Sequence, residues 1–144
     1  MLRIAKCFLV GCAAFLLTAQ LVRPLPKPEA RPEHRPIWDD RNVTPEVKAI
    51  LRRSCADCHS DQTRWPWYSH VAPISWMVAG DVRQGRQKLD FSDWPRNSQD
   101  EKQEIGDAVA SREMPPRKYL FLHPSSRLSP QDIAILDGWI NEVK

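Results

Sequence analysis

Apolar residues recur at helical spacing in four stretches after residue 42, and this pattern predicts four helices. The first begins with Thr44 as N-cap and Pro45 in the first helical position, and its apolar face runs to Cys55. The third begins at Ser98, where Ser98 and Glu101 form a capping-box pattern. No strand pattern stands out between these segments. The sequence therefore predicts an all-α body with long irregular connections.

The other two helices are expected from Pro73 or Ser75 to Lys88, and from Ser129 to near the end of the chain. The third helix ends before Met114, which two prolines follow. The residues expected to face the core are spaced by three or four positions, and they are Ile74, Val78 and Val82; Ile105, Ala108 and Val109; and Ile133, Leu136, Ile140 and Val143, with Ile135 and Trp139 beside them.

A different pattern marks residues 1–22, where no charge interrupts the chain from Cys7 to Val22. A helix over the 19 residues from Ile4 to Val22 would span about 28 Å, close to a hydrocarbon core of roughly 30 Å. Residues 1–22 are therefore interpreted as a transmembrane signal anchor. A cleaved signal peptide and a lipoprotein signal ending at Cys12 are the alternatives. The excess of Lys and Arg after the segment, which the positive-inside rule disfavours for an exported domain, counts against the anchor.

Residues 23–42 contain alternating charges and many prolines, which predicts an extended linker before a domain over 43–144. The formal net charge is only +3 over 144 residues. Nucleic acid is not expected as a partner, because phosphate binding needs a clustered excess of Lys and Arg.

The strongest chemical signal is Cys55-Ala56-Asp57-Cys58-His59. Two cysteines separated by two residues can form thioethers to the vinyl groups of one haem, and the histidine that follows can bind the iron. Cys55, Cys58 and His59 are therefore predicted to hold one covalent haem c.

Other chemistries of a Cys pair were weighed against this one. A structural zinc site needs four ligands, and the remaining histidines are scattered. A thioredoxin-like dithiol would be expected at a helix N-terminus in a βαβ context, whereas this motif follows a helix. A plain disulfide leaves His59 without a role.

The sixth iron ligand is predicted to be Met114, which stands 55 positions after His59, where a helix has just ended. A thioether ligand suits electron transfer because it raises the reduction potential. His70, His123 and Met77 are rivals. A methionine that fills a gap in the core is the alternative for Met114.

Aromatic side chains follow the motif closely. Trp65, Trp67 and Tyr68 are candidate walls of a haem pocket, and their indole and phenol groups can donate to a propionate. The alternative is that these rings fill a core that is short of aliphatic residues.

The segments CADCHSDQTRWPWYSHVAPISW, DVRQGRQKLDFSDW and MPPRKYLFLHPSSRLS resemble the bacterial haem-binding domain family of small cytochrome-c-like proteins over about residues 43–143. The resemblance implies a helical, cytochrome-c-like domain with haem on Cys55 and Cys58 and with His59 as axial ligand. It also favours Met114 as the distal ligand.

We therefore expect a monohaem electron carrier, rather than an enzyme, held at the periplasmic face of a membrane by residues 1–22. Its expected partners are redox proteins among the membrane respiratory components. A peroxidase-like enzyme or a haem-based gas sensor is the alternative if the sixth iron position is open.

Overall fold

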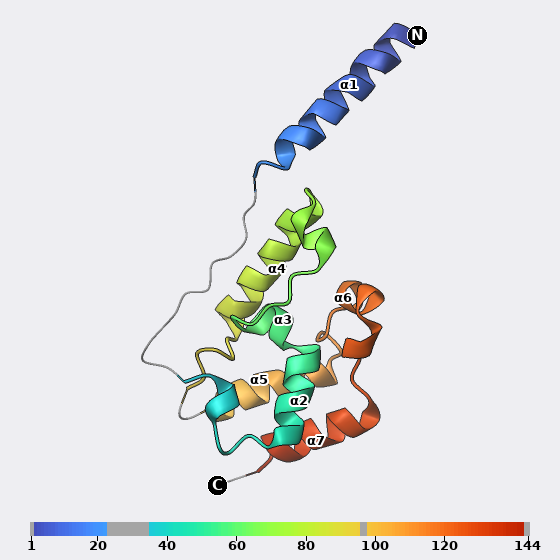
Figure 1. Ribbon diagram of the computed structural model, residues 1–144. Helices are drawn as coiled ribbons and strands as arrows, with labels where there is room; N and C mark the ends of the chain where they lie inside the picture. Colours follow the sequence, from blue (N-terminus) through green and yellow to red (C-terminus); the bar gives the residue numbers. More distant parts are fainter. Residues whose placement is uncertain (1, 23–34, 96–97, 143–144) are drawn as a thin grey trace.

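The computed structural model describes residues 2–22, 35–95 and 98–142. The described chain is helical, and its strand content is limited to one isolated bridge between Arg35 and Trp94. This confirms the predicted all-α class. The helices, shown in Figure 1, are α1 Leu2–Ala19, α2 Pro45–Ser54, α3 Ala56–His59, α4 Ile74–Lys88, α5 Gln99–Ala110, α6 Arg117–Leu122 and α7 Pro130–Ile140, with short 3-10 turns η1 Ile37–Asp39, η2 Trp67–His70 and η3 Pro124–Ser126.

Helices begin directly after Thr44, Ser98 and Ser129, and two of these three residues make a side-chain capping bond. The Thr44 hydroxyl accepts the Val47 N–H at 3.4 Å, as expected for the N-cap of α2. Ser129 and Asp132 form a complete capping box at the start of α7. Ser98 does precede α5, but its side chain makes no capping bond. The predicted Ser98 capping box is wrong because the residue has φ −105° and ψ 22° rather than the extended backbone that directs an N-cap hydroxyl at the helix.

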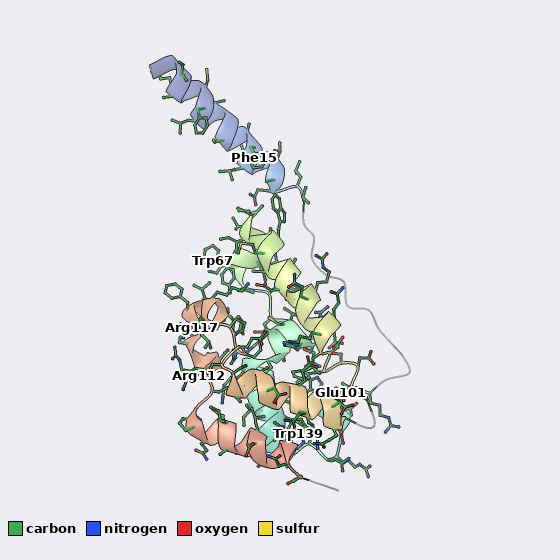
Figure 2. The ribbon with its side chains drawn as sticks, turned by 180° about the vertical axis from the view of Figure 1, so that it is seen from behind. Phe15, Trp67, Glu101, Arg112, Arg117 and Trp139 are labelled. Carbon is green, nitrogen blue, oxygen red and sulfur yellow. The ribbon has the colours of Figure 1, made fainter. Side chains whose placement is uncertain are left out.

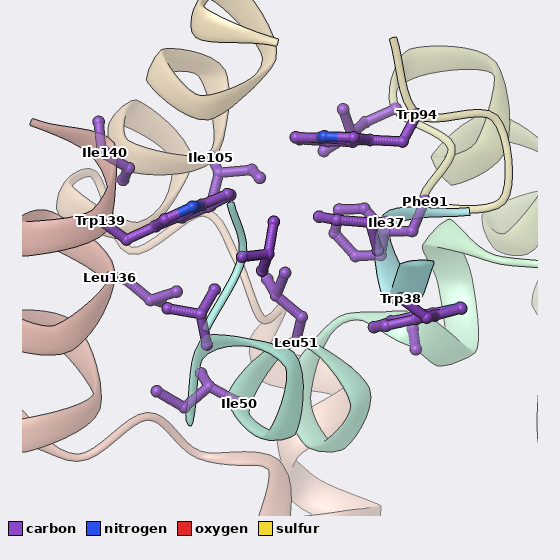
Figure 3. Close-up of a cluster of buried hydrophobic side chains, with 14 of the residues drawn as sticks. Ile37, Trp38, Ile50, Leu51, Phe91, Trp94, Ile105, Leu136, Trp139 and Ile140 are labelled. Atoms are coloured by element: carbon purple, nitrogen blue, oxygen red, sulfur yellow. The ribbon is translucent and has the colours of Figure 1, made fainter. Parts of the chain in front are cut away.

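The core lies where α2, α5 and α7 meet the segment after α4 (Figure 3). Phe91 and Leu51 are fully buried at its centre. Ile37 and Trp38, which the sequence placed in the linker, are also buried here. The Ile37 N–H donates to the Phe91 carbonyl at 2.7 Å, so this short segment is fixed across the core.

Two of the predicted core stripes are partly wrong. Ile74 and Ile133 are 45% and 42% exposed, because each lies off the buried face of its helix, which on α4 consists of Ser75, Ala79 and Val82. The buried face of α7 consists of Leu136, Trp139 and Ile140. Val143 lies outside the described residues.

Helix α1 extends away from the other helices (Figure 1). Its end is held by a pair of hydrogen bonds between the Gln20 amide group and the backbone of Ala72, at 3.0 and 3.3 Å. Among the described residues, no helix combines the length and the hydropathy required to cross a bilayer. The predicted transmembrane anchor is thus not supported.

Candidate functional site

The Cys-x-x-Cys-His motif forms a sharp junction between α2 and α3. The Cys55 N–H closes α2 by donating to the Leu51 carbonyl at 2.9 Å. The Cys55 carbonyl then accepts the N–H groups of Cys58 and His59 at 3.2 and 3.1 Å. Both cysteines are free thiols of intermediate exposure. One turn of backbone therefore fixes the two sulfur atoms and the imidazole relative to one another.

The imidazole of His59 is buried and oriented by the chain. Its Nδ1 lies 2.9 Å from the Leu89 carbonyl oxygen, which can only accept, so Nδ1 carries the proton. The other nitrogen, Nε2, keeps its lone pair, which is the arrangement that oriented metal-binding histidines use. Burial lowers the pKa of His59 and favours this neutral form.

Phe91 supports the same histidine from the core side. Its N–H donates to the His59 carbonyl at 2.7 Å, and its ring centroid lies 5.8 Å from the imidazole centroid. The residues around His59 therefore restrain both its backbone and its ring.

The pKa values of the two thiols are shifted in the opposite direction to those of a redox-active dithiol. Burial raises the pKa of Cys55 to about 12. Burial, with the carboxylates of Asp81 and Asp57, raises the pKa of Cys58 to about 11. Reactive cysteine pairs instead have lowered pKa values, because the thiolate is the nucleophile. The site thus disfavours thioredoxin-like chemistry.

Helix α4 packs directly against the motif at Gly85. A Cβ atom on Gly85 would lie 2.6 Å from the Cys58 carbonyl oxygen, a distance that real side chains do not tolerate. In the next position, the Arg86 guanidinium donates to the Ser60 carbonyl at 2.8 Å and to the Thr63 hydroxyl at 2.9 Å. The last turns of α4 therefore hold both the motif and the chain that leaves it.

Asp57, which stands between the two cysteines, joins the motif to α6. Its carboxylate accepts the Tyr119 hydroxyl at 2.8 Å and the Arg64 guanidinium at 3.2 Å. A second link joins α6 to α4, where Lys118 contacts Asp81 at 2.8 Å. The MPPRKY segment, although more than 50 residues later in the chain, lies against the attachment motif through these contacts.

Met114 stands at the start of this segment, between α5 and α6. Its N–H donates to the Ala108 carbonyl at 3.1 Å, its side chain is partly buried, and Pro115 after it is buried. Its role as the distal ligand stays a prediction.

The other candidate iron ligands differ in their hydrogen-bond partners and in their exposure to solvent. His123 has both ring nitrogens engaged, Nδ1 with the Tyr119 carbonyl at 3.2 Å and Nε2 with the Tyr68 hydroxyl at 3.3 Å. Its ring also stacks on Tyr119 with centroids 4.2 Å apart. His70 is exposed and Met77 is 61% exposed.

The predicted pocket aromatics lie in different environments. Trp65 and Tyr68 are partly buried, and Tyr68 contacts His123 as described. Trp67 is 79% exposed and lies at the surface beside α4 (Figure 2). Their assignment to a haem pocket stays a prediction.

Sequence reasoning missed the supporting residues, which are Asp57, Gly85, Leu89, Phe91 and Tyr119. All five lie within the three segments that carry the family resemblance, but only Asp57, between the two cysteines, and Tyr119, in MPPRKY, stand beside a predicted ligand or in its motif. No local signal in the sequence identifies the Leu89 carbonyl as the partner of His59, because that pairing depends on the path of the chain after α4.

The sequence matches the haem-binding domain family over residues 14–142, and the chain belongs to this family. This confirms the resemblance seen in the sequence. No curated protein and no solved structure matched the chain. The donor set fits the cofactor, since the chain offers two unpaired thiols and one imidazole, oriented through its Nδ1, within a single turn.

Proposed function

We propose that this chain is a monohaem c-type cytochrome that carries single electrons. The observation that carries the proposal is the hydrogen bond from His59 Nδ1 to the Leu89 carbonyl, which orients the imidazole beside two free thiols. When bound, haem supplies the one-electron chemistry, and the protein tunes it through axial ligands and burial.

Each part of the chain has a defined task in this proposal. Cys55 and Cys58 would hold the group through thioethers, and His59 would bind the iron. Met114 would be the second iron ligand, Trp65 and Tyr68 would line the pocket, and Phe91 would keep water from the back of the imidazole.

We further propose that the domain works outside the cytoplasm, because covalent haem attachment takes place on the outer side of the membrane. Residues 1–22 then direct export, and the redox partners are membrane respiratory components. Their contacts with the domain would be small and transient, as is usual for electron-transfer pairs.

The decisive experiment expresses the full chain with c-haem maturation machinery. Haem should stay on the chain in a denaturing gel, and it should be lost from the Cys55→Ala Cys58→Ala variant. Absence of covalent haem from the unmodified chain would refute the proposal.

Absorption spectra of the same sample test the sixth ligand. A low-spin spectrum that becomes high-spin in Met114→Ala, and is unchanged in the control Met77→Ala, supports the electron carrier. A high-spin spectrum in the unmodified protein, shifting with peroxide or carbon monoxide, would instead favour the enzyme or the gas sensor.

A further inference from the structure

Exposed large apolar side chains of the described residues gather in two places. One is α1, and the other is the end of the domain formed by η2, the first turns of α4, and α6. We call the second set the apolar end, and it consists of Trp67, Val71, Ile74, Met77, Phe121 and Leu122. Ile133 on α7 is the exception to this distribution.

The apolar end is continuous across elements that are distant in sequence. The hydrogen bond between Tyr68 and His123 places the end of α6 against η2. Ile74 and Met77, three residues apart on α4, lie on the same side of the helix. Phe121 and Trp67 are 86% and 79% exposed, so the two largest rings of this surface have little cover from the chain itself.

Helix α1 ends directly on this surface. Besides the Gln20 bonds to Ala72, the Trp76 indole N–H donates to the Val22 carbonyl at 3.0 Å. Figure 1 shows α1 continuing outward from the end of the domain where η2 and the start of α4 lie. The two apolar regions are therefore held side by side by hydrogen bonds at 72 and 76.

The side chains of α1 indicate what covers both regions. Ile4, Phe8, Phe15 and Leu17 are 75%, 71%, 66% and 71% exposed, and the apolar side chains surround the helix rather than forming one stripe. A groove on a protein covers one face of a helix, whereas a helix that is apolar all round needs an apolar medium. The Trp76 indole, which bonds to Val22 just after this helix, is of the residue type that prefers the lipid–water interface.

We propose that the apolar end is a membrane contact, which rests on the surface of a lipid bilayer. The contact is peripheral and does not require α1 to cross the bilayer. Aromatic and aliphatic side chains at the headgroup level contribute binding free energy in proportion to the apolar area that they bury. The domain is then held in one orientation, with α7 and its exposed Ile133 facing water.

The test measures depth at two matched positions of the full-length holoprotein. Val71 and Ile133 are each 42% exposed, one within the apolar end and one outside it. In a Cys7→Ser Cys12→Ser background, Val71→Cys and Ile133→Cys are labelled with a nitroxide and bound to phosphatidylethanolamine–phosphatidylglycerol vesicles. Collision rates with oxygen, which partitions into lipid, and with a water-soluble nickel chelate are compared by electron paramagnetic resonance.

The label at position 71 should meet oxygen severalfold more often relative to nickel than the label at 133. Ile74→Cys should give the same result, which protects the test against local misfolding of one variant. If the ratio of oxygen to nickel collision rates were the same at positions 71 and 133, the proposal would be overturned. A label at 71 shielded from both reagents would overturn it in favour of a protein partner. Haem content of each sample is measured separately, so a failure of attachment is distinguished from a failure of lipid contact.

Discussion

The Tyr119 hydroxyl donates a 2.8 Å hydrogen bond to the carboxylate of Asp57, the residue between the two cysteines of the attachment motif. This bond spans 62 positions of sequence and connects α3 to the segment that follows Met114. Burial and the neighbouring Asp57 charge raise the pKa of Tyr119, so the phenol stays a donor throughout the physiological range. The proximal motif and the predicted distal segment are therefore structurally coupled.

Tyr119→Phe should destabilise the domain, because it removes a donor to a largely buried carboxylate. A hydrogen bond to a charged group contributes about 1.5–3 kcal/mol to stability. Denaturant unfolding of the holoprotein measures the loss. Tyr68→Phe is the matched control, because its bond to His123 is longer, at 3.3 Å, and is worth only about 0.5–1 kcal/mol. Equal losses in the two variants would contradict a special role for the Asp57 contact.

Gly85→Ala should disrupt the attachment motif. The added Cβ would meet the Cys58 carbonyl at 2.6 Å, so α4 or the motif must move. We expect less covalent haem per chain and an altered spectrum. Gly80→Ala on the same helix has no atom within 4 Å of its Cβ. It should instead stabilise the protein by about 0.5–1 kcal/mol through helix propensity. Normal haem content in Gly85→Ala would show that the close packing is unimportant.

The interaction of Asp132 with the start of α7 should make stability depend on acid pH. Partial burial acts to raise the pKa of Asp132, but hydrogen bonds from Ser129 and the Arg53 charge at 2.8 Å outweigh it and lower the pKa. The stabilisation is therefore complete above the ordinary carboxyl pKa, and it is lost as the pH falls through the lowered folded-state value. Unfolding free energies measured from neutral to acid pH should show this loss.

Asp132→Asn tests the origin of that acid dependence. The variant should lose about 1 kcal/mol at neutral pH, as removal of a capping interaction does, and its stability should fall less on acidification. Asp137→Asn, at an exposed position of α7, is the control for replacing a carboxylate on the same helix. An acid limb that is the same in all three proteins would assign it to other groups.

Leu51→Ala should cost about 2–5 kcal/mol, because it opens a cavity at a fully buried position. Phe121→Ala removes a larger side chain, but one that is 86% exposed. In solution without lipid it should change stability by less than about 0.5 kcal/mol. Thermal or denaturant unfolding compares the two. Similar losses would mean that Phe121 packs against the domain more closely than its exposure indicates.

Local patterns in the sequence predicted the helices well. Thr44 and Pro45 define the start of α2, and Ser129 defines the start of α7, because these signals act within one helical turn. The same patterns wrongly predicted that the side chains of Ile74 and Ile133 face the core. A stripe of large apolar residues does not reveal that small residues such as Ser75 and Ala79 form the buried face of α4.

The chemistry of the site was predicted for Cys55, Cys58 and His59 as a local motif, while their support was not. This support comes from distant segments that contribute the Leu89 carbonyl, the Gly85 contact and the Tyr119 hydroxyl. Gly85 lies 26 positions after the end of the motif, and Tyr119 lies 64 positions after its start. Ile37 and Trp38 were missed for a related reason. A two-residue apolar segment among prolines has no periodicity, and its burial depends on the path of Phe91.

The aromatic side chains of the core form a connected series that starts at the imidazole. From His59 the ring centroids are separated by 5.8 Å to Phe91, 6.1 Å to Trp94 and 6.3 Å to Trp139, and Trp38 joins at Phe91 with 6.0 Å. Three buried indoles thus lie within efficient energy-transfer range of any chromophore bound at His59. The fluorescence of these tryptophans would be quenched while the cofactor is attached and the core is folded. It would increase when unfolding separates the rings from the cofactor.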